Sequence, residues 1–275
     1  MSNAALYRWD GAKLVTIDHG DAINYTIEVA DSFLVRDGRA FALELHRERF
    51  LEAVHQVGHG LNGLSDLNPE IFWHAALAEI PADSTWFPRV EMQSKDGDAS
   101  LLLRLRTAPE LSRSAVLATH PLADPRHTPM IKGPDLVALV EARTAARRIG
   151  ADDAVILTPE NYVIDGTTSA IVWWRGDILC APPTADDAPE FARVNSVTAR
   201  SLFGMAAVLG VDTHREQVTP TELEGTEVWV LSALHGLRIV TSWIDGPSLA
   251  ELPGRLRLWQ ERRAALVRPI GATTT

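Results

Sequence analysis

The sequence predicts an α+β protein of two domains. Strand-like and helix-like patterns alternate over residues 1–120, and a proline-rich stretch with little apolar patterning follows at 119–129. A second set of helices and apolar strands comes after it. With 275 residues and 46% hydrophobic content, the chain can form two cores. We predict an N-terminal α+β domain over residues 1–120, a linker over 121–130 and a C-terminal domain over 131–275.

The N-terminal elements follow from turn residues and apolar spacing. We expect a hairpin that turns at Asp10-Gly11 and a second pair of strands that turns at Asp37-Gly38. A helix should run from about residue 46 to 58 or 60, and another should begin at residue 69. Two more strands are expected in WFPRVEMQ and SLLLRLR. Asn68 is a good N-cap, and Pro69 is the favoured first residue of a helix.

The C-terminal domain shows two helices among apolar strands. The first spans 135–149 and ends at Gly150, with an expected buried stripe of Leu136, Leu139, Val140 and Ala146. The second runs from about Ser196 to Leu209 and ends at Gly210. The strands of DAVILTPENYVIDGTTSAIVWWRGDILCAPP and VWVLSALHGLRIVTSWIDG are consistent with a meander or barrel.

Charge and hydropathy argue against two classes of protein. The formal charge of -10 and the absence of a Lys/Arg-rich run argue against a nucleic-acid binder. No apolar stretch has the length of a membrane span, and MSNAALYRWDG does not resemble a secretory leader, so we expect a cytoplasmic protein. The histidines show no metal-ligand spacing, and we assign no metal.

Lysine and cysteine are scarce. Lys13, Lys95 and Lys132 are the only lysines, and the first two lie in the polar, turn-like segments DGAK and SKDGD. Lys132 instead follows the proline-rich connection and precedes a patterned helix. The single cysteine, Cys180, cannot form an internal disulfide, and we expect it to be a buried strand residue.

Two blocks of sequence resemble the class IV aminotransferases and their relatives, the aminodeoxychorismate lyases and D-amino-acid aminotransferases. FLVRDGRAFALELHRERF is similar to a strand, Asp-Gly turn, strand and His-x-x-Arg helix start of that family. The resemblance gives Arg49 the role of binding the cofactor phosphate, which suits a planar guanidinium group. In IKGPDLVALVEARTAARRIGADDAVILTPENYVIDGTTS, Lys132 falls on the Schiff-base lysine of pyridoxal phosphate.

The same block places Asp165 where the family has an acidic residue, usually Glu, that pairs with the pyridine nitrogen. The Asp side chain is shorter, so the ring or backbone must shift for this contact. The family's Asn after the Ser is Ala170 here. A plain turn aspartate is the alternative interpretation of Asp165.

Weaker similarities complete the expected phosphate site. SVTARSLFGMAAVLGVD resembles the family's Gly-(Ile/Val)-Thr-Arg helix start, although Ala199 replaces the arginine. The resemblance implies that Val197 and Thr198 bind the cofactor phosphate. The alternative is that Thr198 is a simple N-cap. VWVLSALHGLRIV places Ala233 at a further phosphate contact, with Ser232 as a substitute hydroxyl.

Tyr25 matches the first residue of a Tyr-Gly-Asp-Gly segment that lines the substrate side, but Thr26, Ile27 and Glu28 do not match the rest. This departure affects specificity more than cofactor binding.

The resemblance implies fold type IV: a small α/β N-terminal domain, a larger C-terminal pseudo-barrel, pyridoxal phosphate between them and a homodimer. It implies transamination between an amino acid and a 2-oxo acid through Lys132. One alternative is 4-amino-4-deoxychorismate lyase chemistry on the same lysine. The other is a non-catalytic relative that acts as a binding module, which is suggested by the departures from the family motifs at Thr26, Ile27, Asp165, Ala170, Ala199 and Ala233.

Overall fold

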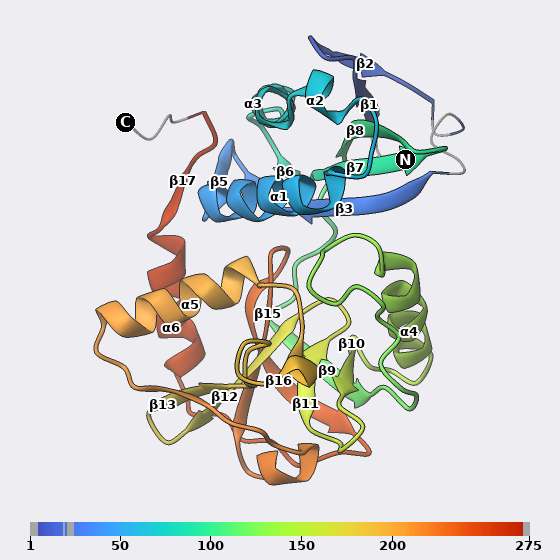
Figure 1. Cartoon of the computed structure of the whole chain (residues 1–275). Helices are drawn as coiled ribbons and strands as arrows, with labels where there is room; N and C mark the ends of the chain where they lie inside the picture. The colour runs from blue at the N-terminus through green and yellow to red at the C-terminus, as the bar shows by residue number, and fades with distance from the viewer. Residues whose placement is uncertain (1–4, 19, 21–24, 272–275) are drawn as a thin grey trace. The chain divides into compact units, whose positions relative to one another are not determined.

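The computed structural model describes residues 5–18, 20 and 25–271 (Figure 1). The chain divides into two compact units. The first contains Met1–Glu110, Ile131–Pro134 and Ala264–Thr275, and the second contains Leu111–Met130 and Asp135–Arg263. Lys132 therefore belongs to the first unit, although the residues that flank its short segment belong to the second. The domain boundaries given from the sequence remain predictions.

The first unit holds two antiparallel sheets and three helices. The five-stranded sheet has the order β2 (Leu14–Thr16), β1 (Ala5–Trp9), β8 (Asp98–Leu105), β7 (Arg89–Lys95) and β3 (Thr26–Ser32). The four-stranded sheet has the order β17 (Val267–Pro269), β5 (Arg39–Phe41), β4 (Val35–Arg36) and β6 (Thr85–Trp86). The helices are α1 (Leu43–Gly58), α2 (Leu64–Leu67) and α3 (Pro69–Ala78).

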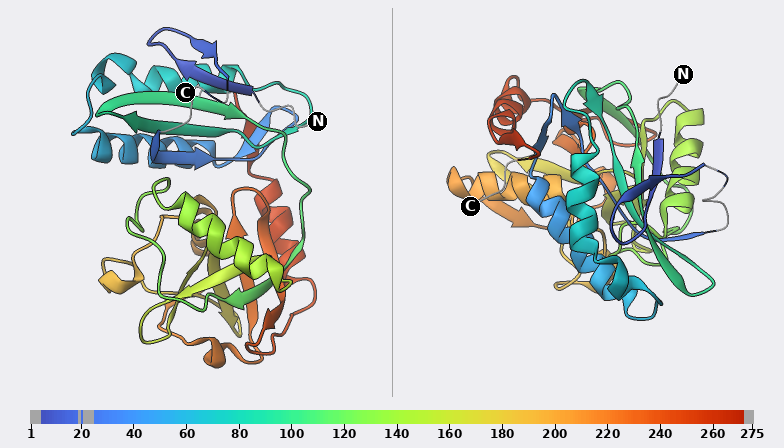
Figure 2. Two further views of the ribbon diagram at one scale, coloured as in Figure 1. Left: turned by 90° about the vertical axis from the view of Figure 1, so that its right-hand side faces the viewer. Right: turned by 90° about the horizontal axis from the view of Figure 1, so that it is seen from above.

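The core of the first unit lies between the five-stranded sheet and helices α1 and α3, which run side by side (Figure 2). Phe50 of α1 meets Phe72 and Trp73 of α3 at ring-centroid distances of 6.2 and 5.9 Å. Alternate residues of β8, such as Leu101 and Leu103, are fully buried on the same core. Helix α1 also contacts β3, so the same core supports the residues of this strand.

The predicted turns and caps of the first unit are confirmed. Asp10-Gly11 connects β1 to β2, and Asp37-Gly38 connects β4 to β5. The Asn68 side chain accepts a hydrogen bond from Ile71 N at the start of α3. Helix α1 begins at Leu43, a few residues before the predicted start.

The second unit is built on one curled sheet of eight strands. Their order is β11 (Val163–Gly166), β10 (Asp153–Leu157), β9 (Ser114–Thr119), β16 (Gly236–Ile244), β15 (Glu227–Ser232), β12 (Ala170–Arg175), β13 (Ile178–Ala181) and β14 (Thr213–Arg215). The helices are α4 (Leu136–Arg148), α5 (Val197–Val208) and α6 (Arg255–Ala264), with short 3-10 helices at Pro189–Phe191 and Pro220–Leu223. Cys180 is buried in β13, as expected.

Helix α4 packs on β10 through Ala146, as the predicted stripe has it, but not through Val140. Val140 is 56% exposed, and the buried residues are Ala142 and Ala146. Ala146 packs with Ala154 of β10, because small side chains allow the helix backbone to approach the sheet closely. The expected burial of Val140 is therefore wrong.

Helices α5 and α6 contribute to a separate core with β12, β15 and β16. In it the rings of Trp174, Trp229 and Trp259 pack edge-on or tilted, with centroids no more than 6.4 Å apart. Gly150 and Gly210, with φ of 95° and 67°, follow the ends of α4 and α5 as predicted. No helix in the described part of the chain combines the length and apolarity needed to cross a membrane.

Candidate active site

Lys132 lies in a short segment that is fixed to the backbone of β3. Ala30 N donates a hydrogen bond of 2.6 Å to the Lys132 carbonyl oxygen. The next residue, Gly133, has φ of 147°, and a Cβ atom there would lie 2.8 Å from Val29 Cα. Only glycine allows this close approach, so the backbone of β3 sets the position from which the Lys132 side chain starts.

A buried carboxylate follows in the same strand. Asp31 has no exposed surface, and its Oδ1 accepts from His46 Nδ1 at 2.7 Å. Its Oδ2 accepts from Arg49 Nε at 2.8 Å and forms an ion pair with Arg49 Nη2 at 2.7 Å. His46 and Arg49 are the His-x-x-Arg pair of the sequence motif, one turn apart on α1. Charge-assisted hydrogen bonds from both sides therefore compensate the desolvation of Asp31.

The charges around Asp31 favour its ionised form. Burial alone would raise its pKa, but the positive charge of Arg49, the contact with His46 and the charge of Lys132 together hold the pKa of Asp31 below its usual range. Burial lowers the pKa of His46 in spite of the adjacent carboxylate. The structure thus brings Arg49 and Lys132, which are far apart in sequence, into the field of one carboxylate.

Tyr25 also belongs to the first unit, just before β3. Two cations lie near its ring, with Arg8 Cζ at 5.6 Å and Lys95 Nζ at 5.3 Å from the ring centroid. Such contacts stabilise an aromatic ring at a half-buried position.

Asp165 lies in β11 of the second unit. The residue is partly exposed, but its Oδ1 atom is shielded from solvent and has no hydrogen-bond partner among the described residues. Burial raises the pKa of Asp165 to about 7, against the opposing charges of Arg126 and Arg193. An acceptor in this state fits a cationic N–H donor, because such a donor would both complete the hydrogen bond and stabilise the ionised form. A protonated pyridine nitrogen is a donor of this kind.

The turn after Asp165 is held by another buried carboxylate, Asp153. The hydroxyl groups of residues 167–169 all donate to it, with Ser169 Oγ at 2.6 Å. Gly166 leaves no room for a side chain, since a Cβ atom would lie 2.7 Å from Ser169 Oγ. The small hydroxyl residues of the DGTTS motif therefore fix the end of β11, and with it Asp165.

The N-terminus of α5 has the predicted form. Ser196 is the N-cap, and its side chain accepts from Ala199 N at 3.3 Å. Val197 and Thr198 are the first two helical residues, and both are buried. The alternative that Thr198 is the N-cap is wrong, because Ser196 caps the helix. The remaining amides of this first turn can bind an anion.

Ser232 and Ala233 mark the end of β15. The Ser232 Oγ atom accepts a hydrogen bond from His235 N at 3.2 Å within the turn that leads to β16. This contact uses the hydroxyl oxygen as an acceptor, so its proton can still be donated.

The two units divide the predicted site residues between them. Tyr25, Arg49 and Lys132 lie in the first unit, and Asp165, Val197, Thr198, Ser232 and Ala233 lie in the second. Sequence reasoning missed Asp31. The sequence does hold a signal for it, because Asp31 is the only acidic residue in the mostly apolar segment VADSFLV, just before the block FLVRDGRAFALELHRERF.

Comparisons with known proteins agree with this geometry. A family model described as Amino-transferase class IV matches residues 28–243. The comparison with curated proteins finds no match.

Among solved structures, the chain is similar to a branched-chain aminotransferase from the archaeon Thermoproteus uzoniensis with norvaline, at 18% identity and a TM-score of 0.77, covering 97% of this chain and 99% of that chain. A fold IV-transaminase from Curtobacterium pusillum matches at 18% identity and a TM-score of 0.73, covering 96% and 97%. A hypothetical aminotransferase from Mycobacterium tuberculosis in a PLP-bound form matches at 18% identity and a TM-score of 0.72, covering 96% and 98%. The predicted α+β fold of type IV is thereby confirmed.

Proposed function

Since the chain belongs to the class IV aminotransferases, enzymes that use pyridoxal phosphate, we propose that it transfers an amino group between an amino acid and a 2-oxo acid, with Lys132 as the lysine that carries the cofactor. The observation that carries the proposal is the shielded Asp165 Oδ1 atom, which lacks a partner in the described chain. Bound pyridoxal phosphate supplies an electron sink for the charge that develops when a proton leaves the substrate Cα atom.

Lys132 has two tasks in this proposal. Its Nζ atom would hold the cofactor and would take up the proton that leaves the substrate Cα atom. The second task requires a defined starting position for the side chain. The hydrogen bond from Ala30 N and the close approach of Gly133 to β3 provide that position.

Arg49 would bind the cofactor phosphate, and Asp31 orients the Arg49 side chain. Because Asp31 Oδ2 contacts both Nε and Nη2, the plane of the guanidinium group is fixed before any ligand arrives. Fixing a donor in advance removes part of the entropy cost of binding. Asp31 thus supports binding without contacting the cofactor.

The second unit contributes Asp165 and the phosphate-binding amides. Asp165 would hold the pyridine nitrogen of the cofactor, and its negative charge would favour the protonated form of that nitrogen. Val197 and Thr198 donate from the first turn of α5, and the Thr198 hydroxyl adds a further donor. Ala233 N contributes a backbone contact, and the Ser232 hydroxyl group is positioned in the same turn. Tyr25 lies on the substrate side.

The experiment is to follow the visible absorption of the purified protein while L- and D-amino acids are added as amino donors. Transamination predicts a shift of the cofactor band with a suitable donor and the recovery of the original band with a 2-oxo acid. Lys132→Ala should abolish turnover, whereas Lys13→Ala, which changes an exposed lysine, should not.

Two other results would replace this proposal. Formation of pyruvate and p-aminobenzoate from aminodeoxychorismate, without amine transfer, would identify the lyase. A protein that stays colourless with added pyridoxal phosphate would indicate a binding module. A homodimer and a cytoplasmic location are part of the proposal and rest on the resemblance and on the sequence.

A further inference from the structure

The loop that leads into α5 packs on the strand that carries Asp165. Its 3-10 helix, Pro189–Phe191, places Phe191 in one buried cluster with Ile156 of β10 and Ile164 of β11. Ile156 is also the partner of Asp165 in the register of these two strands. Because directly paired residues point to the same face of a sheet, Asp165 lies on the face where Phe191 packs. This packing brings the loop next to Asp165.

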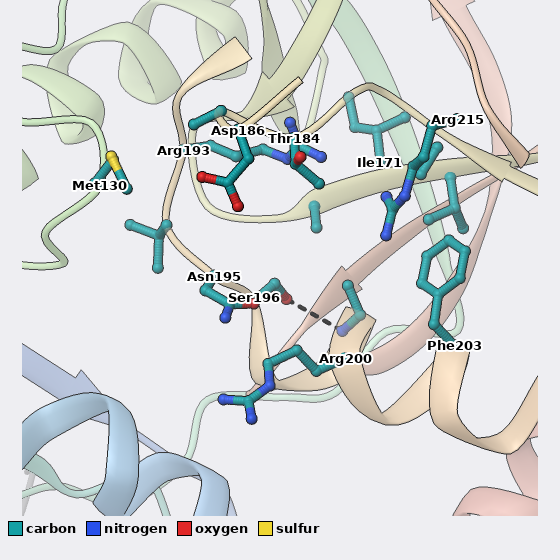
Figure 3. A pocket seen from close by; sticks show the side chains of 16 residues that line it. Met130, Ile171, Thr184, Asp186, Arg193, Asn195, Ser196, Arg200, Phe203 and Arg215 are labelled. Atoms are coloured by element: carbon teal, nitrogen blue, oxygen red, sulfur yellow. Dashed lines mark hydrogen bonds between the residues drawn. The ribbon is translucent and has the colours of Figure 1, made fainter. Parts of the chain in front are cut away.

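Arg193 follows two residues after Phe191, and its guanidinium group turns back onto the same loop. Its Nη1 atom donates to the carbonyl oxygens of Phe191 and Pro183, at 3.0 and 2.6 Å, and its Nη2 atom donates to that of Pro182 at 3.0 Å. Arg193 and Arg200 lie on opposite sides of a pocket beside α5 (Figure 3). Carbonyl oxygens carry no net charge, so the three contacts fix the guanidinium group without cancelling its charge.

Charged groups of neighbouring elements also face Asp165. Asp153, on the adjacent strand β10, carries a like charge, and Arg126, in the loop after β9, carries an opposite one. Arg126 is already paired, because its Nε and Nη2 atoms donate to the two carboxylate oxygens of Asp124, at 2.9 and 2.7 Å. Asp124 therefore offsets part of the Arg126 charge, whereas the contacts of Arg193 described above are all with neutral oxygens.

The balance of these charges sets the ionisation of Asp165. Burial raises its pKa to about 7, and the positive charges of Arg126 and Arg193 limit that rise. Burial also lowers the pKa of Arg193, and Asp165 is the acid whose charge opposes this fall. Arg193 and Asp165 therefore each favour the charged form of the other.

We propose that Arg193 is a positioning residue for Asp165: its fixed charge keeps the ionised form of this buried carboxylate populated near neutral pH, so that the carboxylate can accept a hydrogen bond from a cationic N–H group. This role rests on the proposed function, because the pyridine nitrogen of the cofactor is the donor proposed for Asp165. Arg193 itself would not contact the cofactor and would act only through the carboxylate.

The test is denaturant unfolding of the cofactor-free full chain at several pH values, with and without Asp165→Asn. The stability gained by Asp165→Asn grows with pH while the wild-type carboxylate loses its proton in the folded state, and it then levels off. In the background of the natural Arg193, the gain should level off near pH 7, the value to which burial raises the pKa of Asp165. In the background of Arg193→Gln, the pH at which the gain levels off should rise by about one unit or more.

Three further variants separate the charge of Arg193 from its support of the loop. Arg193→Lys loses the three carbonyl contacts but keeps the charge, so the gain should level off close to the wild-type pH. Arg193→Met is a second neutral replacement, with an unbranched apolar side chain, and should behave as Arg193→Gln does. Asp186→Asn removes an exposed carboxylate that lies on the same side of the pocket as Arg193, and it should leave the pH at which the gain levels off unchanged (Figure 3).

An unchanged pH in both neutral variants would overturn the proposal, because Arg193 would then support only the loop. An equal rise in Arg193→Lys would overturn it as well, because the charge would not be the cause. The unfolding experiment contains neither cofactor nor substrate, so its failure is distinct from a failure of the proposed amino transfer, which the absorption experiment with amino donors tests.

Discussion

Asp31, which is buried, and Arg49, which is partly buried, form an ion pair in which one carboxylate oxygen, Oδ2, contacts both Nε and Nη2 of the guanidinium group, at 2.8 and 2.7 Å. The second oxygen accepts from His46 Nδ1 at 2.7 Å. A carboxylate from β3 thus connects the two motif residues of α1. Lys132 shares its field, so a change at Asp31 should affect stability and cofactor binding together.

Asp31→Asn should lower the free energy of unfolding by about 2 to 4 kcal/mol, because it leaves the Arg49 charge buried without its counter-charge. It should also weaken binding of pyridoxal phosphate by about tenfold or more, because the guanidinium plane is no longer fixed. Denaturant unfolding and a cofactor titration measure the two effects.

The matched control is Glu261→Gln, which removes one carboxylate from an exposed ion pair with Arg257. It should cost less than about 1 kcal/mol and leave cofactor affinity unchanged. Equal behaviour of the two variants would show that Asp31 does not position Arg49.

Asp165 should make the stability of the cofactor-free protein depend on pH. Burial raises its pKa from 3.8 to about 7, so the folded state holds a proton that the unfolded state has already lost between these values. The contribution of Asp165 is therefore fully present below pH 3.8 and is lost as the pH rises to about 7.

Asp165→Asn should gain stability relative to wild type over this window, by about 1 to 3 kcal/mol at pH 8, and should show no gain below the lower pKa. Unfolding curves at several pH values measure this difference. Asp212→Asn, at an exposed position, provides the control and should follow the wild-type profile. A constant difference at every pH would contradict the raised pKa.

Gly133→Ala should be strongly destabilising. The new Cβ atom would lie 2.8 Å from Val29 Cα at a φ of 147°, so the Lys132 segment would have to leave β3. We expect a loss of about 2 to 4 kcal/mol. Gly204→Ala adds the same methyl group inside α5, where no atom lies within 4 Å, and should be neutral or stabilising. Thermal unfolding of both variants measures the difference. Similar melting temperatures would show that Gly133 does not lie so close to Val29 of β3.

Ser196→Ala and Asn68→Ala each remove the side-chain cap of a helix, α5 and α3 respectively. Each should lower the free energy of unfolding by about 1 kcal/mol. Only the Ser196 variant should also weaken cofactor binding, because only α5 is proposed to present its first amides to the phosphate. If the two variants bind pyridoxal phosphate equally well, the N-terminus of α5 is not the phosphate site.

The features found from the sequence were those with local causes. Ser196 and Gly210 mark the ends of α5, and Asp37-Gly38 forms its turn, because capping and turn geometry depend on neighbouring residues. Lys132 stood out because it is one of three lysines and the motif around it is long.

The features that were missed depend on distant partners. Strand β9 pairs with β10 and β16, which lie far along the chain. The partner of Arg49 could not be inferred from spacing, because Asp31 meets it only after β3 and α1 pack together. The exposure of Val140 follows from the close approach of Ala146 to β10, which periodicity alone does not reveal.

The most direct test of the account is to incubate the protein with pyridoxal phosphate, reduce it with borohydride and locate the added mass by peptide mass spectrometry. We predict one modified peptide, the one that contains Lys132, and none in Lys132→Ala. Modification of Lys13 or Lys95 instead, or no modification at all, would contradict the assignment of Lys132 and the amino-transfer function that depends on it.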